Sequence, residues 1–247
     1  MEDHSHITSI AAGIIYAIAS LRMIRLNRRT GERPELLLGL YFACSAQWYL
    51  VYYAPQLLGF EALPPLLESG IEWIYAVGFA PYLLFIRGVF RPGATWAAGV
   101  MIGSSLLLLV GCIASSLRGG FTNSIDDPAY LIEWVGYTVP CIWMACEGTL
   151  AHASAKRRVR IGLCDPIVAN RYLLFAIFGF VQLSSCAADL LWTYEVSNGV
   201  VASSLSDVVL AGTEIASAAV LTLVFFPPQL YSDWINRRAA IPSIPVD

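Results

Sequence analysis

Apolar residues are gathered into seven long segments along the chain, and the breaks between them are rich in proline, glycine and charge. Typical breaks are residues 28–34, 91–93 and 126–128. Each segment has about 20 residues or slightly more, the length that an α-helix needs to cross a hydrocarbon core of about 30 Å. The predicted helices cover residues 7–25, 35–57, 66–88, 95–116, 129–152, 170–193 and 205–227. The pattern therefore predicts an all-α integral membrane protein, a bundle of seven transmembrane helices.

The composition supports a protein whose solvent is the bilayer. Of the 247 residues, 57% are hydrophobic and 13% are charged, whereas a soluble domain has about 45–50% apolar and about 25% charged residues. A surface that faces water cannot be built from so few charges. We expect a single transmembrane domain over residues 1–247, with a short cytoplasmic tail from 228 to 247 and no attached soluble catalytic domain.

Basic residues predict the orientation, because short cytoplasmic loops retain Lys and Arg. Of the 15 Lys and Arg residues, only Arg118 falls in a break on the opposite side from the others. The sequence therefore predicts an amino terminus outside the cytoplasm and a carboxyl terminus inside, in a multi-pass protein of a plasma or inner membrane.

Carboxylates inside the predicted helices are the strongest functional signal, since ionisable groups in hydrocarbon usually face a bundle interior or a water-filled cavity. Glu72, Glu133 and Asp189 are placed in the outer third of the membrane by their position along each helix, and Glu214 near its middle. In the sixth segment, Gln182 and Asp189 share one helical face. We predict that these residues, with neighbouring tryptophans, form one ligand site in an outward-opening chamber: Glu72, Trp73, Glu133, Trp134, Gln182, Asp189 and Glu214.

No Lys or Arg is expected at the depth of these acids or of Glu147 in the fifth segment, so ion pairs should not neutralise them. Either some of them are protonated or a cation binds among them. Aromatic rings at the same level would suit an organic cation. The alternative interpretation is that Trp and Tyr lie at a membrane interface for their own reasons, and that acids in first helical turns are wetted by outer water.

Catalytic and metal-binding motifs are lacking in the sequence. The three histidines are His4 and His6 near the amino terminus and His152 at the cytoplasmic end of the fifth segment, where a snorkelling or helix-capping role is expected. This set argues against a zinc hydrolase. Because no nucleophile–base set, phosphate loop or dinucleotide fingerprint is present, we expect neither an enzyme nor a nucleic-acid-binding protein.

The predicted topology resembles that of rhodopsins and heptahelical receptors. A rhodopsin would need a lysine in the seventh helix to bind retinal, but the only lysine is Lys156, in a predicted cytoplasmic loop. The run from Pro227 to Tyr231 is similar to the Asn-Pro-x-x-Tyr element of heptahelical receptors, with Pro227 in place of Asn. The following residues, 232–238, could lie along the inner membrane surface. The resemblance is not enough to assign a family, and the sequence does not indicate a cofactor.

Two functions use the predicted site. The first is a receptor or sensor that binds a small cationic ligand or protons in the chamber and signals through a cytoplasmic signalling protein, with membrane lipid as its surroundings. The alternative is a small proton- or cation-coupled transporter that uses the same carboxylates. The sequence favours the receptor slightly, because polar residues are sparse in the inner halves of the sixth and seventh helices.

Overall fold

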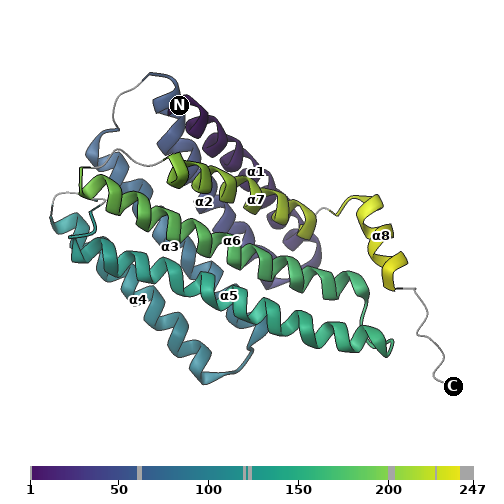
Figure 1. Ribbon diagram of the computed structural model, residues 1–247. Coiled ribbons are helices and arrows are strands. Elements are labelled where there is room, and N and C mark those ends of the chain that lie inside the picture. The colour runs from purple at the N-terminus through teal and green to yellow at the C-terminus, as the bar shows by residue number, and fades with distance from the viewer. Residues whose placement is uncertain are drawn as a thin grey trace.

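The computed structural model describes residues 2–59, 63–118, 121, 124–199, 204–225 and 227–239. All regular secondary structure in these residues is α-helical, and it forms eight helices (Figure 1). The helices are α1 (Glu2–Thr30), α2 (Arg33–Leu57), α3 (Pro65–Phe90), α4 (Thr95–Leu117), α5 (Pro128–Arg160), α6 (Pro166–Ser197), α7 (Ser204–Phe225) and α8 (Gln229–Ala239).

Five helices are long and apolar enough to cross a membrane, namely α1, α3, α4, α6 and α7. The predicted all-helical membrane protein is therefore supported by composition and by helix length. The helices α2 and α5 are not in this group; α2 contains several Trp and Tyr residues, and α5 carries Glu133, Glu147 and a basic last turn. A bundle of seven membrane spans, and its orientation, remain predictions.

Helix bounds agree with the sequence pattern except at a few ends. The fifth helix runs to Arg160 rather than to 152, because residues 153–160 contain Ala, Lys and Arg, which favour helix. The sixth begins at Pro166 rather than at 170, where Asp165 caps it by accepting a hydrogen bond from the backbone N–H of Ile167 at 2.8 Å. Proline is suited to the first helical position because it has no N–H to leave unpaired.

From α1 to α7, each helix packs against the next one in the chain, and α7 also packs against α1. The backbones of α5 and α6 approach most closely at two glycines. A Cβ atom on Gly179 would lie 2.4 Å from the backbone nitrogen of Ala145, and one on Gly148 would lie 2.5 Å from that of Ala176. Small residues of this kind allow close helix packing where no hydrophobic effect drives association.

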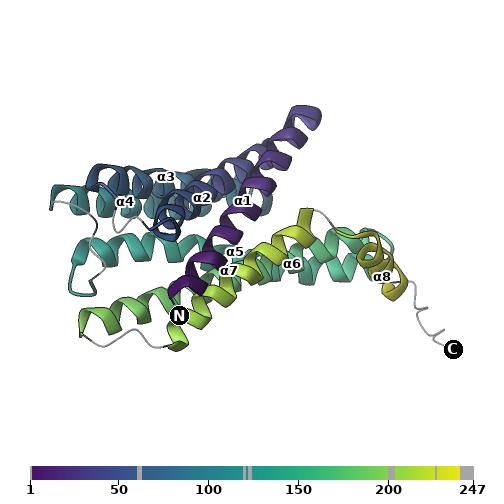
Figure 2. The ribbon, with the colours of Figure 1, turned by 90° about the horizontal axis from the view of Figure 1, so that it is seen from above.

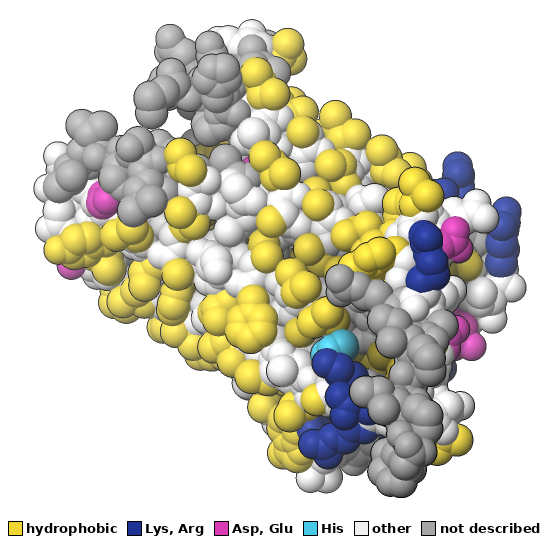
Figure 3. Space-filling view, turned by 45° about the vertical axis from the view of Figure 1, so that its right-hand side comes forward, with side chains coloured by type: hydrophobic (Ala, Val, Ile, Leu, Met, Phe, Trp, Pro, Cys, Tyr) yellow, Lys and Arg dark blue, Asp and Glu magenta, His cyan; other side chains and the backbone are white. Residues whose placement is uncertain are grey.

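The long helices alternate in direction, so that their ends collect at two ends of the molecule (Figures 1 and 2). We call the end at which α1, α3, α5 and α7 begin the amino-terminal end, and the opposite one, next to α8, the α8 end. The last turns of α1 and α5 at the α8 end are basic. In Figure 3, Lys and Arg gather toward one end of the visible face, whereas hydrophobic side chains cover its sides.

The helix α8 follows two prolines and packs against α6, where Asn170 donates a hydrogen bond to the Tyr231 hydroxyl at 2.8 Å. The tail beyond the seventh segment is therefore helical over residues 229–239. Its position along a membrane surface remains a prediction.

Candidate functional site

Glu72 of α3 faces an aromatic group on α2. Its carboxylate accepts a hydrogen bond from the indole N–H of Trp48 at 3.0 Å. The Trp48 ring stacks on Tyr52, with ring centroids 5.7 Å apart, and lies 5.3 Å from the ring of Tyr75. The half-buried acid thus has a neutral donor and aromatic walls.

Glu133 of α5 faces α4 and is buried. It accepts hydrogen bonds from the Tyr137 hydroxyl at 2.8 Å and from the Cys112 thiol at 3.5 Å. The approach requires a glycine on α4, since a Cβ on Gly111 would lie 2.7 Å from the Cβ of Glu133. This acid also has only neutral donors.

Asp189 of α6 faces α5. It accepts a hydrogen bond from the Tyr130 hydroxyl at 3.0 Å, and that hydroxyl lies 2.9 Å from the hydroxyl of Thr193. One turn away, the indole N–H of Trp134 donates to the backbone carbonyl of Cys186 at 3.0 Å. Trp134 thus ties α5 to α6 beside Asp189.

Glu214 and Gln182 belong to the side of the molecule where α7 meets α1 and α6. Both carboxylate oxygens of Glu214 lie within hydrogen-bond distance of the Ser9 hydroxyl, at 3.0 and 3.2 Å. Gln182 accepts from the Ser217 hydroxyl at 2.8 Å, and its amide nitrogen lies 3.4 Å from the Tyr41 hydroxyl. Polar contacts therefore connect α1 to α7, and α6 to both α2 and α7.

The structure brings Glu72 within electrostatic range of two other predicted acids. Glu72 interacts electrostatically with Glu133 and with Asp189. Glu214 is not in that group, but the Tyr53 hydroxyl interacts with both Glu214 and Asp189. We call Glu72, Glu133, Asp189 and Glu214, with the donors Trp48, Tyr137, Cys112, Tyr130 and Ser9, the acid–aromatic cluster.

One predicted residue lies apart from this cluster. Trp73 turns toward α4, where its indole N–H donates to the Ser116 hydroxyl at 3.0 Å in an exposed position. Two cavities of the described structure also lie elsewhere, one along α3 and α4 and one between the start of α2 and the end of α3. That the predicted site lines one open chamber remains a prediction.

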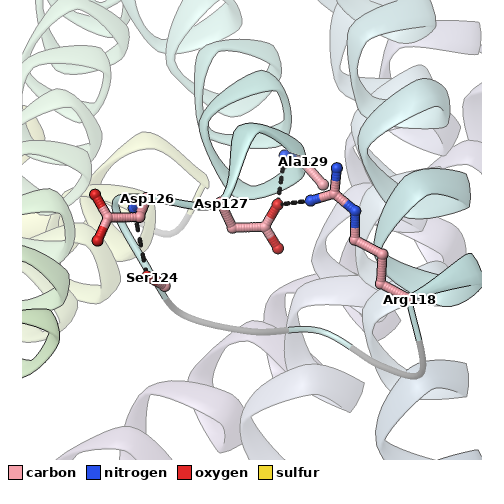
Figure 4. Close-up of polar contacts among 5 residues, drawn as sticks. All are labelled: Arg118, Ser124, Asp126, Asp127 and Ala129. Carbon is pink, nitrogen blue, oxygen red and sulfur yellow. Dashed lines mark hydrogen bonds and ion pairs between the residues drawn. The ribbon is translucent and has the colours of Figure 1, made fainter.

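No Lys or Arg forms an ion pair with the four cluster acids within the ranges that the structure describes. Arg118, the basic residue predicted on this side, pairs instead with Asp127 (Figure 4). Asp127 also caps α5 by accepting from the backbone N–H of Ala129 at 2.8 Å, while the nearby Ser124 hydroxyl accepts from the backbone N–H of Asp126. Arg118, the basic residue nearest in sequence to the cluster, is therefore paired with Asp127 rather than with a cluster acid.

The prediction that no ion pair neutralises the acids inside the helices is wrong for Glu147. Its carboxylate lies 2.7 Å from Nε of Arg91 and accepts from the indole N–H of Trp143 at 3.3 Å. The hydrogen bond and the charge of Glu147 raise the pKa of the Arg91 guanidinium, which also lies over the Trp96 ring. Counting residues along helices missed this pair, because the long arginine side chain reaches back toward the bundle from the turn after α3.

His152 has a different role from the one expected. Its Nδ1 lies 2.8 Å from the backbone carbonyl of Ala169, so it bridges α5 to α6 rather than capping its own helix. In the described part of the chain, no group of three or more His, Cys, Asp or Glu residues is placed to hold a metal ion.

Comparison with known proteins identified no similar protein. No protein-family model matches the chain. No curated protein and no solved structure matches it either. The function is therefore argued from the chemistry of the acid–aromatic cluster.

Sequence reasoning found the acids but missed most of their partners. Tyr137 lies four residues after Glu133, and helical spacing alone could have paired them. Cys112 and Ser9 lie on other helices, so no local signal connects them to Glu133 and Glu214. Their role depends on which helices are neighbours.

Proposed function

We propose that this chain is a membrane receptor or sensor that binds a small cation, or takes up protons, at the acid–aromatic cluster. The observation that carries the proposal is that four carboxylates have neutral donors as their hydrogen-bond partners in the described structure. A carboxylate removed from water needs either a proton or a positive charge beside it. A cation bound among these acids would supply that charge, and the rings around Trp48 would favour an organic one.

We further propose that seven helices cross the membrane with the amino-terminal end outside and the α8 end in the cytoplasm. The basic last turns of α1 and α5 support this orientation. Cysteine labelling tests it, with Asp126→Cys expected to react with an impermeant reagent from outside and Arg158→Cys only after permeabilisation. Labelling in the reverse pattern would overturn the orientation, and the wild-type protein gives the background from its own cysteines.

A receptor accounts for the α8 half of the molecule better than a transporter. The packing there is apolar and aromatic, with Phe85, Phe175 and Phe178 buried between helices. Glu147, an acid that could have received a transported cation, is paired with Arg91. A bound cation would instead draw together the acids of α3, α5 and α6, and the shift would reach a cytoplasmic signalling protein at the α8 end.

Tetramethylammonium is a suitable probe for the cation site. With the protein in lipid nanodiscs, titration should change the fluorescence of tryptophan in the wild type. Glu72→Gln should weaken binding about tenfold or more, because a charged hydrogen-bonding partner contributes about 1.5–3 kcal/mol. The control is Asp126→Asn, which changes an exposed acid at the same end and should bind as the wild type does.

Proton uptake is tested by carboxyl-stretch infrared difference spectroscopy on the wild type and Glu214→Gln. A protonated-carboxyl band in the absence of added cation, lost in the variant, supports proton binding. If neither such a band nor tetramethylammonium binding is observed, the cluster is structural and the proposed function is wrong.

Flux separates the receptor from the transporter. In proteoliposomes we expect binding without sustained movement of tetramethylammonium or protons. Sustained flux that is abolished by Glu72→Gln would replace the receptor with the transporter.

A further inference from the structure

A cavity of about 580 Å³ opens at the α8 end, between the start of α2 and the end of α3. Among the described residues, the charged ones that line it are Arg33 and Arg87, and its apolar walls include Leu36, Leu37 and Leu84. The volume lies within the range of about 300–1,000 Å³ that is usual for small-molecule sites. The cavity is separate from the acid–aromatic cluster.

Arg87 brings an unused hydrogen-bond donor to this cavity. Its Nε is inaccessible to solvent and has no hydrogen-bond partner in the structure. An unpaired buried donor on a cation is costly, and an anion is the partner that would satisfy it best. Arg33 supplies a second guanidinium from the first residue of α2, where the positive end of that long helix adds to the attraction.

The acids nearest to the cavity in the chain lie outside its lining. Glu32 and Glu35 flank Arg33 in the chain, but neither lines the cavity, and the Glu35 carboxylate accepts a hydrogen bond from the Thr30 hydroxyl at 2.5 Å. No carboxylate lines the cavity. The two arginines are therefore not neutralised by the cavity's own walls.

A narrow apolar groove adjoins the cavity at Leu84. It has a volume of about 260 Å³ and lies between α3 and α4, with Ala80, Leu84, Met101 and Leu106 among its lining residues. Leu84 lines both spaces and lies about one helical turn from Arg87. A ligand could thus place a charged group on the arginines and a hydrocarbon chain along the groove.

We propose that the cavity and groove together bind one anionic phospholipid, with its phosphate on Arg33 and Arg87 and an acyl chain along Leu84 between α3 and α4. Arginine suits phosphate because its fork of N–H donors matches the phosphate oxygens. The position agrees with the proposed orientation, since the cytoplasmic leaflet carries the anionic lipids. The inference rests on the membrane assignment but not on the proposed cation site.

Native mass spectrometry of the full chain tests the proposal. The detergent-solubilised protein is offered phosphatidylglycerol or phosphatidylcholine with identical acyl chains, and the lipid-bound fraction is measured. Phosphatidylglycerol should bind more tightly than phosphatidylcholine. Arg87→Gln should weaken phosphatidylglycerol binding about tenfold, and the exposed Arg33→Gln about fivefold. Arg157→Gln, which changes an exposed arginine in the last turn of α5, is the control and should have no effect.

Each other outcome contradicts the proposal. Equal binding of the two lipids, or unchanged phosphatidylglycerol binding in both Arg33→Gln and Arg87→Gln, would mean that no specific headgroup site exists. Displacement of the lipid by inorganic phosphate at equal concentration would assign the cavity to free phosphate instead. Circular dichroism checks the fold of Arg87→Gln, and Arg33→Gln tests the site even if that variant fails to fold. Tetramethylammonium binding should be unchanged in Arg33→Gln, so a failure here is distinguishable from a failure of the cation site.

Discussion

Glu72 and Glu147 stand toward opposite ends of the molecule and share one kind of donor, yet in the described structure only Glu147 has a cation beside it. Each accepts a hydrogen bond from an indole N–H, Glu72 from Trp48 at 3.0 Å and Glu147 from Trp143 at 3.3 Å. Glu147 also has the Arg91 guanidinium at 2.7 Å, whereas Glu72 forms no ion pair with any residue that the structure describes. An indole N–H can therefore fix the position of a carboxylate, but it does not balance the negative charge. At Glu147 a separate group, the Arg91 guanidinium, does so.

The two acids differ in this respect because basic residues are distributed unevenly between the two ends of the molecule. The α8 end has many arginines, and one of them reaches Glu147. At the amino-terminal end, Arg118 pairs with Asp127 beside the first turn of α5. Within the described residues, no cation lies beside Glu72 as Arg91 lies beside Glu147, and the proposed function rests on this difference.

The largest effect on stability is expected for Arg91→Gln. This change leaves Glu147, whose side chain is only 7% exposed, without its cation. The thermal unfolding midpoint in detergent should fall clearly, and the double variant Arg91→Gln with Glu147→Gln should recover most of the loss. Equal unfolding midpoints for the single and double variants would show that the charge of unpaired Glu147 is not the cause of the lost stability.

Trp48→Phe should have the next largest effect. It removes the neutral donor of Glu72 while keeping an aromatic ring, and an unsatisfied, partly buried acceptor costs about 1–3 kcal/mol. The free energy of unfolding by denaturant measures the change. Trp73→Phe is the matched control, because it removes an indole N–H that bonds to Ser116 in an exposed position, and a loss as large as that of Trp48→Phe would contradict the argument.

Glu72→Gln should change stability by no more than about 0.5 kcal/mol, a range typical of substitutions that break no named interaction. The amide oxygen of Gln can still accept from Trp48. Glu147→Gln, by contrast, removes the charge that pairs with Arg91 and should be the more destabilising of the two. The same denaturant measurement ranks both variants, and the reverse order would remove the contrast between the two ends.

The smallest effect is expected for Arg118→Gln. Exposed ion pairs contribute about 0–1 kcal/mol, and Asp127 keeps its capping bond to the backbone N–H of Ala129. Stability and tetramethylammonium binding should both stay close to those of the wild type. A marked gain in cation binding would mean that Arg118 acts on the cluster from a distance.

Local patterns predicted the helices well because each one depends on its own residues. Apolar segments gave their approximate bounds, and Pro166 after Asp165 could have given the start of α6 more exactly. Trp73 faces α4 whereas its neighbour Glu72 bonds to Trp48 of α2, since a shift of one residue along a helix turns a side chain by about 100°. Glu72 and Trp73 are therefore adjacent in the sequence but contact different helices.

By itself, the sequence determined the all-helical, membrane-suited character of this protein and which carboxylates lie inside its helices, because length, hydropathy and charge are properties of single segments. Only the tertiary structure decided which acids are neutralised. Arg91 reaches Glu147 across 56 positions in the chain, and Ser9 reaches Glu214 across 205. Such pairs depend on which helices are neighbours and how far each side chain extends, and neither quantity is encoded in local spacing.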